Sequence, residues 1–155
     1  MTVTGSLVSR FTTRRRIEFS DTDLSGLVHF SRFFVFMETA EHEFVESLGT
    51  RIHVTSDDGE EVGWPRVSAE CRYLSPARFG DTLDILVRVE RKGERSMTYG
   101  FEFTIGERLI ARGRIKTVCC VVNDPGGLRS VPVPAAIADC VEADPGEREE
   151  VANDG

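Results

Sequence analysis

The stretch "RIEFSDTDLSGLVHFSRFFVFMETAEHEF", residues 16–44, decides the fold because it contains the long helical pattern of the chain. From about residue 30, apolar side chains recur at intervals of three and four, which is typical of a helix with one buried face. Gly49 follows as a helix stop. The apolar positions are Phe30, Phe33, Phe34, Met37, Ala40, Phe44, Val45 and Leu48, and the expected polar face carries Arg32, Glu38, Glu41, His42, Glu43 and Glu46.

Strand patterns surround this helix, one before it at residues 11–19 and four after it at 63–74, 82–91, 96–106 and 108–122. Apolar and polar residues alternate most clearly in "TLDILVRV" and "YGFEFTI", and the short connections "KGERS" and "GE" are typical of hairpins. The four later strands are therefore expected to form an antiparallel meander. Because a sheet with one long helix must cover a face with it, the sequence predicts an α+β fold in which about five antiparallel strands wrap around one central helix.

The remaining segments complete a single predicted domain over residues 1–142. Residues 50–62 are expected to be a polar loop, and residues 131–143 a short helix with Pro134 in its first turn. The acidic tail, residues 143–155, is expected to be disordered because it is rich in charge and poor in large apolar side chains. The uncovered sheet face and the sheet edges predict self-association.

Composition bounds the function classes. The chain has 155 residues, 40% hydrophobic and 29% charged, with a net charge of −7, which argues against a nucleic-acid surface. No apolar run is long enough to cross a bilayer and no secretory signal is recognisable, so a cytoplasmic protein without membrane contact is expected. The cysteines show no metal-ligand spacing and are expected to be buried, reduced thiols, and neither a metal nor another cofactor is expected. They are Cys71, Cys119, Cys120 and Cys140.

Two carboxylates, Asp21 and Asp23, stand just before the helix and admit two interpretations. They can be turn residues and partners of the helix dipole, worth about 0.3–1 kcal/mol. Alternatively, the unpaired N–H groups near residues 29–31 can hold an oxyanion, while a carboxylate nearby attacks a carbonyl or activates water. Gly26 allows the intervening loop to pass close to the helix end. Spacing alone leaves both interpretations open.

A resemblance adds to this interpretation. The segment "RIEFSDTDLSGLVHFSRFFVFMETA" resembles the N-terminal signature of hotdog-fold acyl-CoA thioesterases of the 4-hydroxybenzoyl-CoA thioesterase type. The segments "YLSPARFGDTLDILVRVERKGERSMTYGFEF" and "VPVPAAIADCV" are similar to later parts of the same family, so the resemblance covers roughly residues 12–142. It implies a hotdog fold and hydrolysis of an acyl- or aroyl-CoA thioester to the free acid and CoA.

The resemblance also implies roles for individual residues. Asp23 would be the catalytic carboxylate, as nucleophile or general base, and the backbone N–H of Phe30 would polarise the thioester carbonyl. His29 would either assist catalysis or only pack and hydrogen-bond. Asp21 matches a position that is commonly acidic and is expected to pair with a nearby arginine.

The family works as dimers of hotdogs, often tetramers, with each site at a subunit interface and CoA on the surface. This chain is therefore expected to form a homodimer or homotetramer, and CoA enters as part of the substrate rather than as a cofactor. Its phosphates would contact "RKGERS", where the expected binding residues are Arg91, Lys92, Arg95 and Ser96. Gly93 and Glu94 interrupt the more continuous basic run of the family, so a carrier-protein thioester remains an alternative substrate.

Two further functions stay open beside thioester hydrolysis. A hydratase or dehydratase acting on an acyl thioester would need a His with an acidic partner, and only His29 is placed for this. A non-catalytic acyl-binding module would keep the fold without turnover, although such a pocket gains nothing from the Asp23 carboxylate.

Overall fold

The computed structural model describes residues 5–144 and 146 of the chain. Its two α-helices are α1 (Arg32–Ser47) and α2 (Ala135–Ala138), and a 3₁₀ turn, η1 (Phe19–Asp21), precedes α1. The strands are β1 (Arg10–Arg16), β2 (Val54–Thr55), β3 (Glu61–Gly63), β4 (Arg66–Tyr73), β5 (Thr82–Lys92), β6 (Ser96–Ile105), β7 (Arg108–Val118), β8 (Cys120–Asp124) and β9 (Gly127–Ser130).

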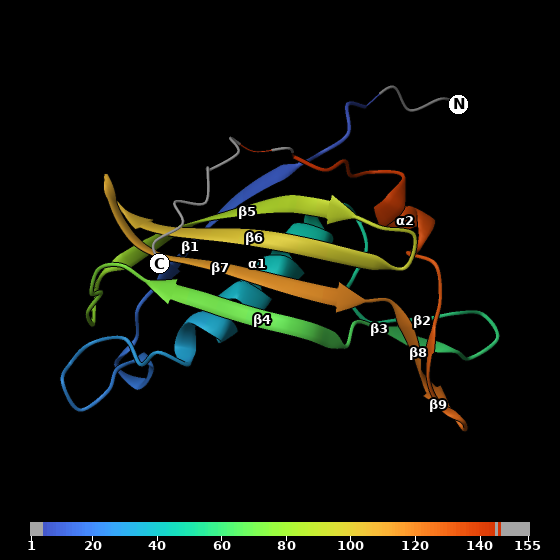
Figure 1. Cartoon of the computed structure of the whole chain (residues 1–155), viewed down its shortest axis with the longest axis horizontal. Helices are drawn as coiled ribbons and strands as arrows, with labels where there is room; N and C mark the ends of the chain where they lie inside the picture. The colour runs from blue at the N-terminus through green and yellow to red at the C-terminus, as the bar shows by residue number, and fades with distance from the viewer. Residues whose placement is uncertain (1–4, 145, 147–155) are drawn as a thin grey trace, which may run out of the picture.

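The main sheet has five antiparallel strands in the order β1-β5-β6-β7-β4, and it curves around α1 (Figure 1). This confirms the predicted architecture of one long helix covered by an antiparallel sheet. The expected meander of four strands was wrong in one place, because β4 pairs with β7 and not with β5. Both sides of β5 are already occupied, by β1 and by β6, so β4 forms the far edge of the sheet.

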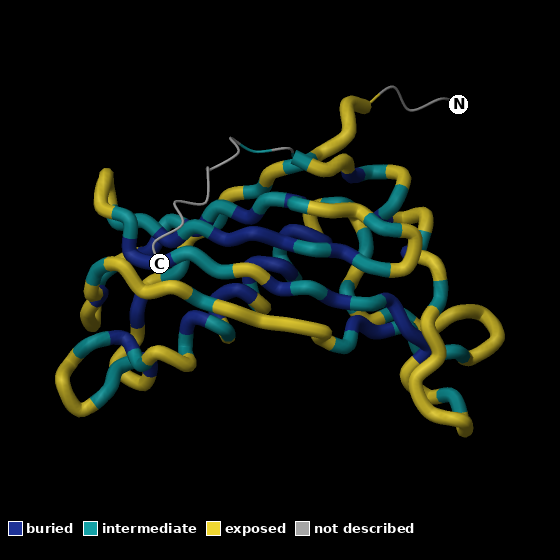
Figure 2. The backbone as a smooth tube through the Cα atoms, in the orientation of Figure 1, coloured by how far each residue is buried: buried dark blue, intermediate teal, exposed yellow. Residues whose placement is uncertain are grey.

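The core lies between α1 and the concave face of the sheet, and buried residues alternate with less buried ones along β5 and part of β6 (Figure 2). Gly113 of β7 lies beneath the helix, and a Cβ atom at this position would overlap the Met37 sulfur. This glycine therefore allows helix and sheet to approach closely. Buried core residues from the helix include Phe33, Phe36, Met37, Ala40 and Phe44, and those from β5 and β6 include Leu83, Ile85, Val87, Val89, Met97, Tyr99, Phe101 and Phe103.

The opposite face of the sheet carries ion pairs rather than an apolar layer. Arg14 pairs with Asp84 across β1 and β5, and Arg114 bridges Glu90 and Glu70 across β5, β7 and β4. This convex face is charged because the outward residues of the alternating strands are polar.

A second, smaller sheet of order β2-β3-β8-β9 was not predicted. Residues 50–62, expected to be a loop, contribute β2 and β3, and the pattern at 108–122 divides at Cys119 into β7 and β8, which belong to different sheets. Two of its strands have only two or three residues, too few to display an alternating pattern. Pro134 is the N-cap of α2 and stands just before its first turn.

The helix α1 begins at Arg32, two residues later than expected, and one residue of its predicted polar face is buried. Glu41 is fully buried, and its carboxylate accepts two hydrogen bonds from the Arg66 guanidinium at 2.8 and 2.9 Å. Burial raises the pKa of Glu41 even though Arg66 opposes this effect. The bonding partner on β4 explains why a carboxylate is tolerated on the buried side.

Residues 143 and 144 and Gly146 are the described part of the predicted acidic tail, and the other residues of that tail lie outside the described chain. Cys119 and Cys120 are buried, Cys71 and Cys140 are half-buried, and all four are free thiols. Within the described residues, neither helix has the length and apolar character needed to span a bilayer.

Candidate active site

The first part of the candidate site is the turn η1, which ends in a carboxylate without solvent exposure. Asp21 Oδ1 accepts hydrogen bonds from Nε and Nη2 of Arg32 at 2.9 and 2.7 Å, and Arg15 Nη2 lies 3.5 Å from the same oxygen. Asp21 Oδ2 accepts the Glu18 backbone N–H at 2.8 Å. The expected pairing of Asp21 with nearby arginines is confirmed, and the carboxylate joins β1, η1 and the start of α1.

The charge state of Asp21 follows from these contacts. Burial alone would raise the pKa of Asp21, but the Glu18 N–H, the hydrogen bond from Arg32 and the positive charges of Arg15 and Arg32 together hold it below its ordinary value. Asp21 is therefore ionised at neutral pH and has all its polar contacts inside the protein.

The second part is the loop from Thr22 to Val28, which these two residues close as an isolated antiparallel bridge. Asp23 Oδ1 accepts the N–H groups of Ser25 at 2.8 Å and Leu27 at 3.3 Å, as in an Asx turn. Gly26 has a φ of 76°, in the left-handed region that favours glycine. Within the described residues, Asp23 Oδ2 has no hydrogen-bond partner, so one oxygen shapes the turn and the other is available.

The third part is the segment 29–31, where the chain enters α1. The His29 N–H donates to the Asp21 carbonyl at 2.8 Å, and the Arg32 N–H donates to the His29 carbonyl at 2.9 Å. The carbonyl oxygens of Phe30 and Ser31 accept hydrogen bonds from the Tyr73 hydroxyl and the Phe34 N–H.

The His29 side chain contacts both of the residues that follow it. Its Nδ1 accepts the Ser31 N–H at 3.2 Å and lies 2.7 Å from the Ser31 hydroxyl, while its ring stacks on Phe30 with centroids 4.5 Å apart. Within the described residues, the Phe30 N–H is thus the one backbone polar group of residues 29–31 without a protein partner. The observed contacts of His29 are those of a packing and hydrogen-bonding residue.

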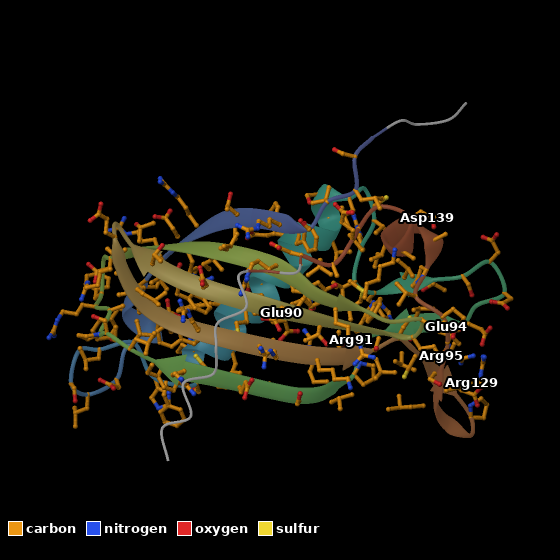
Figure 3. All side chains as sticks on the ribbon, turned by 45° about the horizontal axis from the view of Figure 1, so that its top comes forward. Glu90, Arg91, Glu94, Arg95, Arg129 and Asp139 are labelled. Carbon is orange, nitrogen blue, oxygen red and sulfur yellow. The ribbon has the colours of Figure 1, made fainter. Side chains whose placement is uncertain are left out.

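The predicted phosphate-binding residues lie at the end of the sheet opposite the loop that contains Asp23, at the turn between β5 and β6 (Figures 1 and 3). The Asp23 loop lies beside Arg78, just before β5, and the eleven residues of β5 separate it from this turn by about 35 Å. One chain therefore does not bring Asp23 together with Arg91, Lys92, Arg95 and Ser96.

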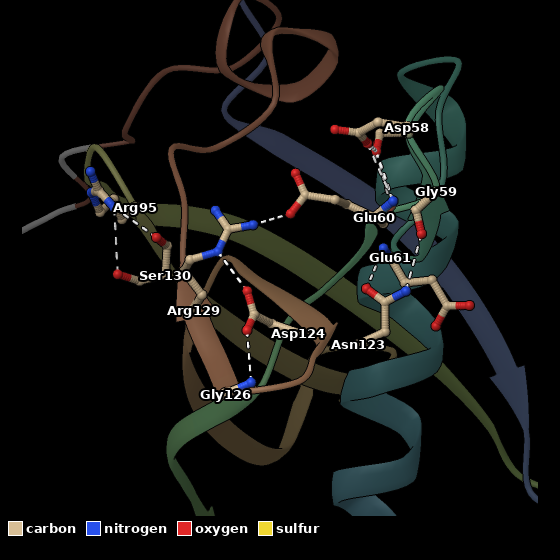
Figure 4. Close-up of polar contacts among 11 residues, drawn as sticks. Asp58, Gly59, Glu60, Glu61, Arg95, Asn123, Asp124, Gly126, Arg129 and Ser130 are labelled. Carbon is tan, nitrogen blue, oxygen red and sulfur yellow. Dashed lines mark hydrogen bonds and ion pairs between the residues drawn. The ribbon is translucent and has the colours of Figure 1, made fainter.

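Two of these side chains have partners within the chain. The Lys92 ammonium donates to the carbonyls of Ala138 and Val141, next to the end of α2. Arg95 Nη1 donates to the Ser130 carbonyl of β9 at 2.7 Å, close to Arg129, which binds Glu60 and Asp124 (Figure 4). Arg91 is exposed.

Sequence reasoning expected an arginine beside Asp21 but did not identify it as Arg15 or Arg32, and it missed the contact of Tyr73 with Phe30. A signal for Arg32 existed, because a cation in the first turn of a helix opposes the helix dipole unless an anion compensates it. The Tyr73 contact joins residues far apart in sequence, and no local pattern indicates it.

Comparisons with known proteins now identify the class. The fold aligns with 4-hydroxybenzoyl CoA thioesterase from Pseudomonas sp. strain CBS-3 at a TM-score of 0.72 and 22% identity, covering 86% of this chain and 99% of that one. It aligns with a gentisyl-coenzyme A thioesterase at a TM-score of 0.73 and 26% identity, covering 85% and 100%. The architecture is therefore the hotdog fold of thioesterases.

Sequence comparison gives the family. Residues 17–141 match the thioesterase-like superfamily, and the chain belongs to it. A protein of Aquifex aeolicus (strain VF5), described provisionally as an esterase, is 31% identical over 122 residues, 79% of this chain and 91% of that protein. A 1,4-dihydroxy-2-naphthoyl-CoA hydrolase of Prochlorococcus marinus (strain MIT 9303) is 31% identical over 109 residues, 66% and 72% of the two chains. The chain is an enzyme of the thioester-hydrolase class.

Proposed function

We propose that this enzyme hydrolyses an acyl- or aroyl-CoA thioester, with Asp23 as nucleophile or general base and the Phe30 N–H as the donor to the thioester carbonyl oxygen. The observation that carries the proposal is that two groups close together in the chain lack a hydrogen-bond partner within the described residues: Asp23 Oδ2 in the loop and the Phe30 N–H at the entrance of α1. A carboxylate and an oxyanion donor are the two groups that acyl transfer requires.

The chemistry is a substitution at the thioester carbon. As general base, Asp23 takes a proton from water while the water oxygen bonds to the carbonyl carbon, and the Phe30 N–H stabilises the oxyanion. The C–S bond then breaks, the CoA thiolate takes up the proton that Asp23 removed from water, and the free acid is released. As nucleophile, the Asp23 carboxylate attacks the carbonyl carbon and the C–S bond breaks, which releases the CoA thiolate and leaves a mixed anhydride. Water then hydrolyses the anhydride, which restores the Asp23 carboxylate, releases the free acid and supplies the proton that CoA takes up.

An aroyl group is favoured over a long aliphatic chain by the aromatic surface near the loop. Phe19 and Phe79 are exposed and stack edge to face, and Phe30 and Tyr73 are exposed beside the start of α1. Several relatives are named 1,4-dihydroxy-2-naphthoyl-CoA hydrolases, which is consistent with a flat aromatic substrate.

A homodimer would complete the site. The edge strand β4 has a paired neighbour, β7, on one side only within the described chain, and Val67, Tyr73 and Leu74 are exposed on or beside it. Antiparallel pairing of two copies along β4 would place opposite ends of the two sheets side by side. The β5–β6 turn of one copy, with Arg91 and Arg95, would then lie on the side of its partner's Asp23 loop, as an interfacial site requires. Two such dimers could associate as a tetramer.

The experiment is an assay of thiol release from acetyl-, hexanoyl-, palmitoyl-, benzoyl-, 4-hydroxybenzoyl- and 1,4-dihydroxy-2-naphthoyl-CoA, with the parent protein and Asp23→Asn. The expected result is hydrolysis of at least one aroyl-CoA by the parent and its loss in the variant. Unchanged hydrolysis by Asp23→Asn would overturn the role of Asp23. Binding without turnover of any thioester would indicate an acyl-binding module.

The proposed binding of the CoA phosphates by Arg95 is tested with Arg95→Ala and with pantetheine thioesters, which lack the nucleotide. The variant should raise KM for the CoA ester by about tenfold with kcat nearly unchanged, and it should leave KM for the pantetheine ester unaffected. Arg51→Ala, at an exposed arginine, is the matched control. Equal KM values for CoA and pantetheine esters in the parent would favour a carrier-protein thioester.

A further inference from the structure

The carbonyl oxygen of Phe30 is held by a side chain from another element. Tyr73, the last residue of β4, donates its hydroxyl proton to this oxygen with an O···O distance of 2.8 Å. The two residues are 43 positions apart in the chain, so the bond fixes the entrance of α1 to the edge of the sheet.

This bond is the second of two that hold the backbone on either side of the Phe30 N–H. The Phe30 N–H belongs to the same planar peptide as the His29 carbonyl, and the Arg32 N–H holds that carbonyl. The Tyr73 hydroxyl holds the carbonyl of the following peptide. With the peptides on both sides of its Cα atom anchored, Phe30 cannot rotate freely about φ or ψ, and its N–H keeps one direction.

Tyr73 is itself well placed to act as a fixed anchor. Its ring packs edge to face on the buried ring of Phe33, with centroids 5.5 Å apart, and Phe33 in turn packs on Phe103 of β6. Burial raises the pKa of Tyr73, with a further contribution from Cys71, so the hydroxyl keeps the proton that it donates.

The strand does not depend on this hydroxyl. The β4–β7 ladder holds β4 from Arg66 to Tyr73, where Tyr73 lies opposite Ala111, and Tyr73 as a residue is 46% exposed. A phenylalanine at this position keeps the ring contact with Phe33 and loses the bond to the Phe30 carbonyl, together with the interaction of the hydroxyl with Cys71.

We infer that Tyr73 is a positioning residue for catalysis. Its hydroxyl holds the Phe30 carbonyl, which fixes the backbone of Phe30 so that the Phe30 N–H points at the thioester oxygen. This inference rests on the proposed function and adds a residue that acts through the oxyanion donor rather than on the substrate.

The first test is the kinetics of Tyr73→Phe on the most rapidly hydrolysed CoA thioester of the panel. Removing an oxyanion donor costs 10²–10³-fold in kcat, and a donor that is present but less well directed should cost about tenfold, with KM within about twofold of the parent. Tyr99→Phe is the matched control, because it removes the hydroxyl of the second of the two tyrosines, which lies in the core. Its kcat should stay within about twofold of the parent.

The second test is spectroscopic and is insensitive to a general loss of stability. Benzoyl-CoA bound to Asp23→Asn is observed by Raman difference spectroscopy, and the thioester C=O stretch reports how strongly the carbonyl is polarised. Adding Tyr73→Phe should move this band toward its frequency in free solution, while adding Tyr99→Phe should leave it in place.

The outcomes separate the two proposals. A parent that hydrolyses thioesters, with Tyr73→Phe equal to the parent in kcat and in the C=O band, would overturn the role of Tyr73 alone. A change only in KM, or the same loss of kcat in Tyr99→Phe, would also overturn it. A parent that hydrolyses no thioester would contradict the proposed function itself and remove the basis of this assignment.

Discussion

The two carboxylates of the "SDTDLSG" segment lie two residues apart in surroundings that differ in every respect. Asp21 is fully buried, its two oxygens accept hydrogen bonds from Arg32 and Glu18, and its pKa is held below the ordinary value. Asp23 is half-buried; its Oδ1 accepts hydrogen bonds from its own turn, and its Oδ2 has no hydrogen-bond partner among the residues that the structure describes. The comparison indicates that a carboxylate with both oxygens hydrogen-bonded holds the structure of the site together, whereas a carboxylate with an oxygen left without a partner in the described chain is available for chemistry.

The largest effect on stability is expected from Asp21→Asn, because it leaves two arginine charges without their buried partner. The free energy of unfolding should fall by about 3 kcal/mol, measured by urea denaturation. Asp84→Asn is the matched control, since Asp84 pairs with Arg14 on the exposed sheet face, and it should cost less than about 1 kcal/mol. Equal losses in the two variants would remove the distinction between a structural and a surface carboxylate.

A smaller loss is expected when the cations around Asp21 are removed one at a time. Arg32→Gln should lower the free energy of unfolding by about 2 kcal/mol, because Arg32 supplies both guanidinium hydrogen bonds to Oδ1. Arg15→Gln should cost about 1 kcal/mol, since Arg15 lies 3.5 Å away and also stacks over Phe36. A larger loss of unfolding free energy for Arg15→Gln than for Arg32→Gln in the same denaturation series would show that Arg15, and not Arg32, is the main partner of Asp21.

A still smaller change in stability is expected at Asp23. Asp23→Asn keeps an Oδ1 acceptor for the N–H groups of Ser25 and Leu27, so the melting temperature should correspond to a change within about 0.5 kcal/mol. Asp23→Ala removes the acceptor and should cost roughly 1 kcal/mol by the same measurement. A strongly destabilised Asp23→Asn would mean that Asp23, like Asp21, is mainly structural.

The last expected effect appears only at acid pH. The folded pKa of Asp21 is below its ordinary value of 3.8, so its contribution to stability is full above pH 3.8 and is lost as the pH falls below that value. The difference in unfolding free energy between the parent and Asp21→Asn should therefore shrink as the pH is lowered from 5 to 2. A difference that stays constant over this range would contradict the ionised, hydrogen-bonded state of Asp21.

The sequence was sufficient for the parts of the fold that long patterns encode. The helix α1 and the strands β1 and β4–β7 follow from residue spacing, and the Asp23–Gly26 turn follows from the conformational preferences of Asp and Gly. The short strands β2 and β3 carry too few residues to show a period, and the position of β4 beside β7 depends on tertiary packing.

In the candidate site, too, the sequence was sufficient only for features that depend on neighbouring residues. The loop and the start of the helix could be predicted because both depend on neighbouring residues in the sequence. The prediction of unpaired N–H groups throughout residues 29–31 overestimated their number. The N–H groups of His29 and Ser31 have hydrogen-bond partners, and within the described part of the chain only that of Phe30 among the three has none. The role of Tyr73 and the burial of Glu41 depend on partners on a distant strand, so neither could be inferred from local sequence.

The measurement that tests the central claim most directly is kcat for Asp23→Asn and Asp21→Asn, side by side, at a temperature where both are folded. Asp23→Asn should lose about a thousandfold in kcat without losing stability, and Asp21→Asn should keep kcat within about tenfold of the parent despite its lower stability. A folded Asp23→Asn that turns over at the parent's rate, or a folded Asp21→Asn that is the inactive one of the two, would contradict the assignment of the catalytic carboxylate.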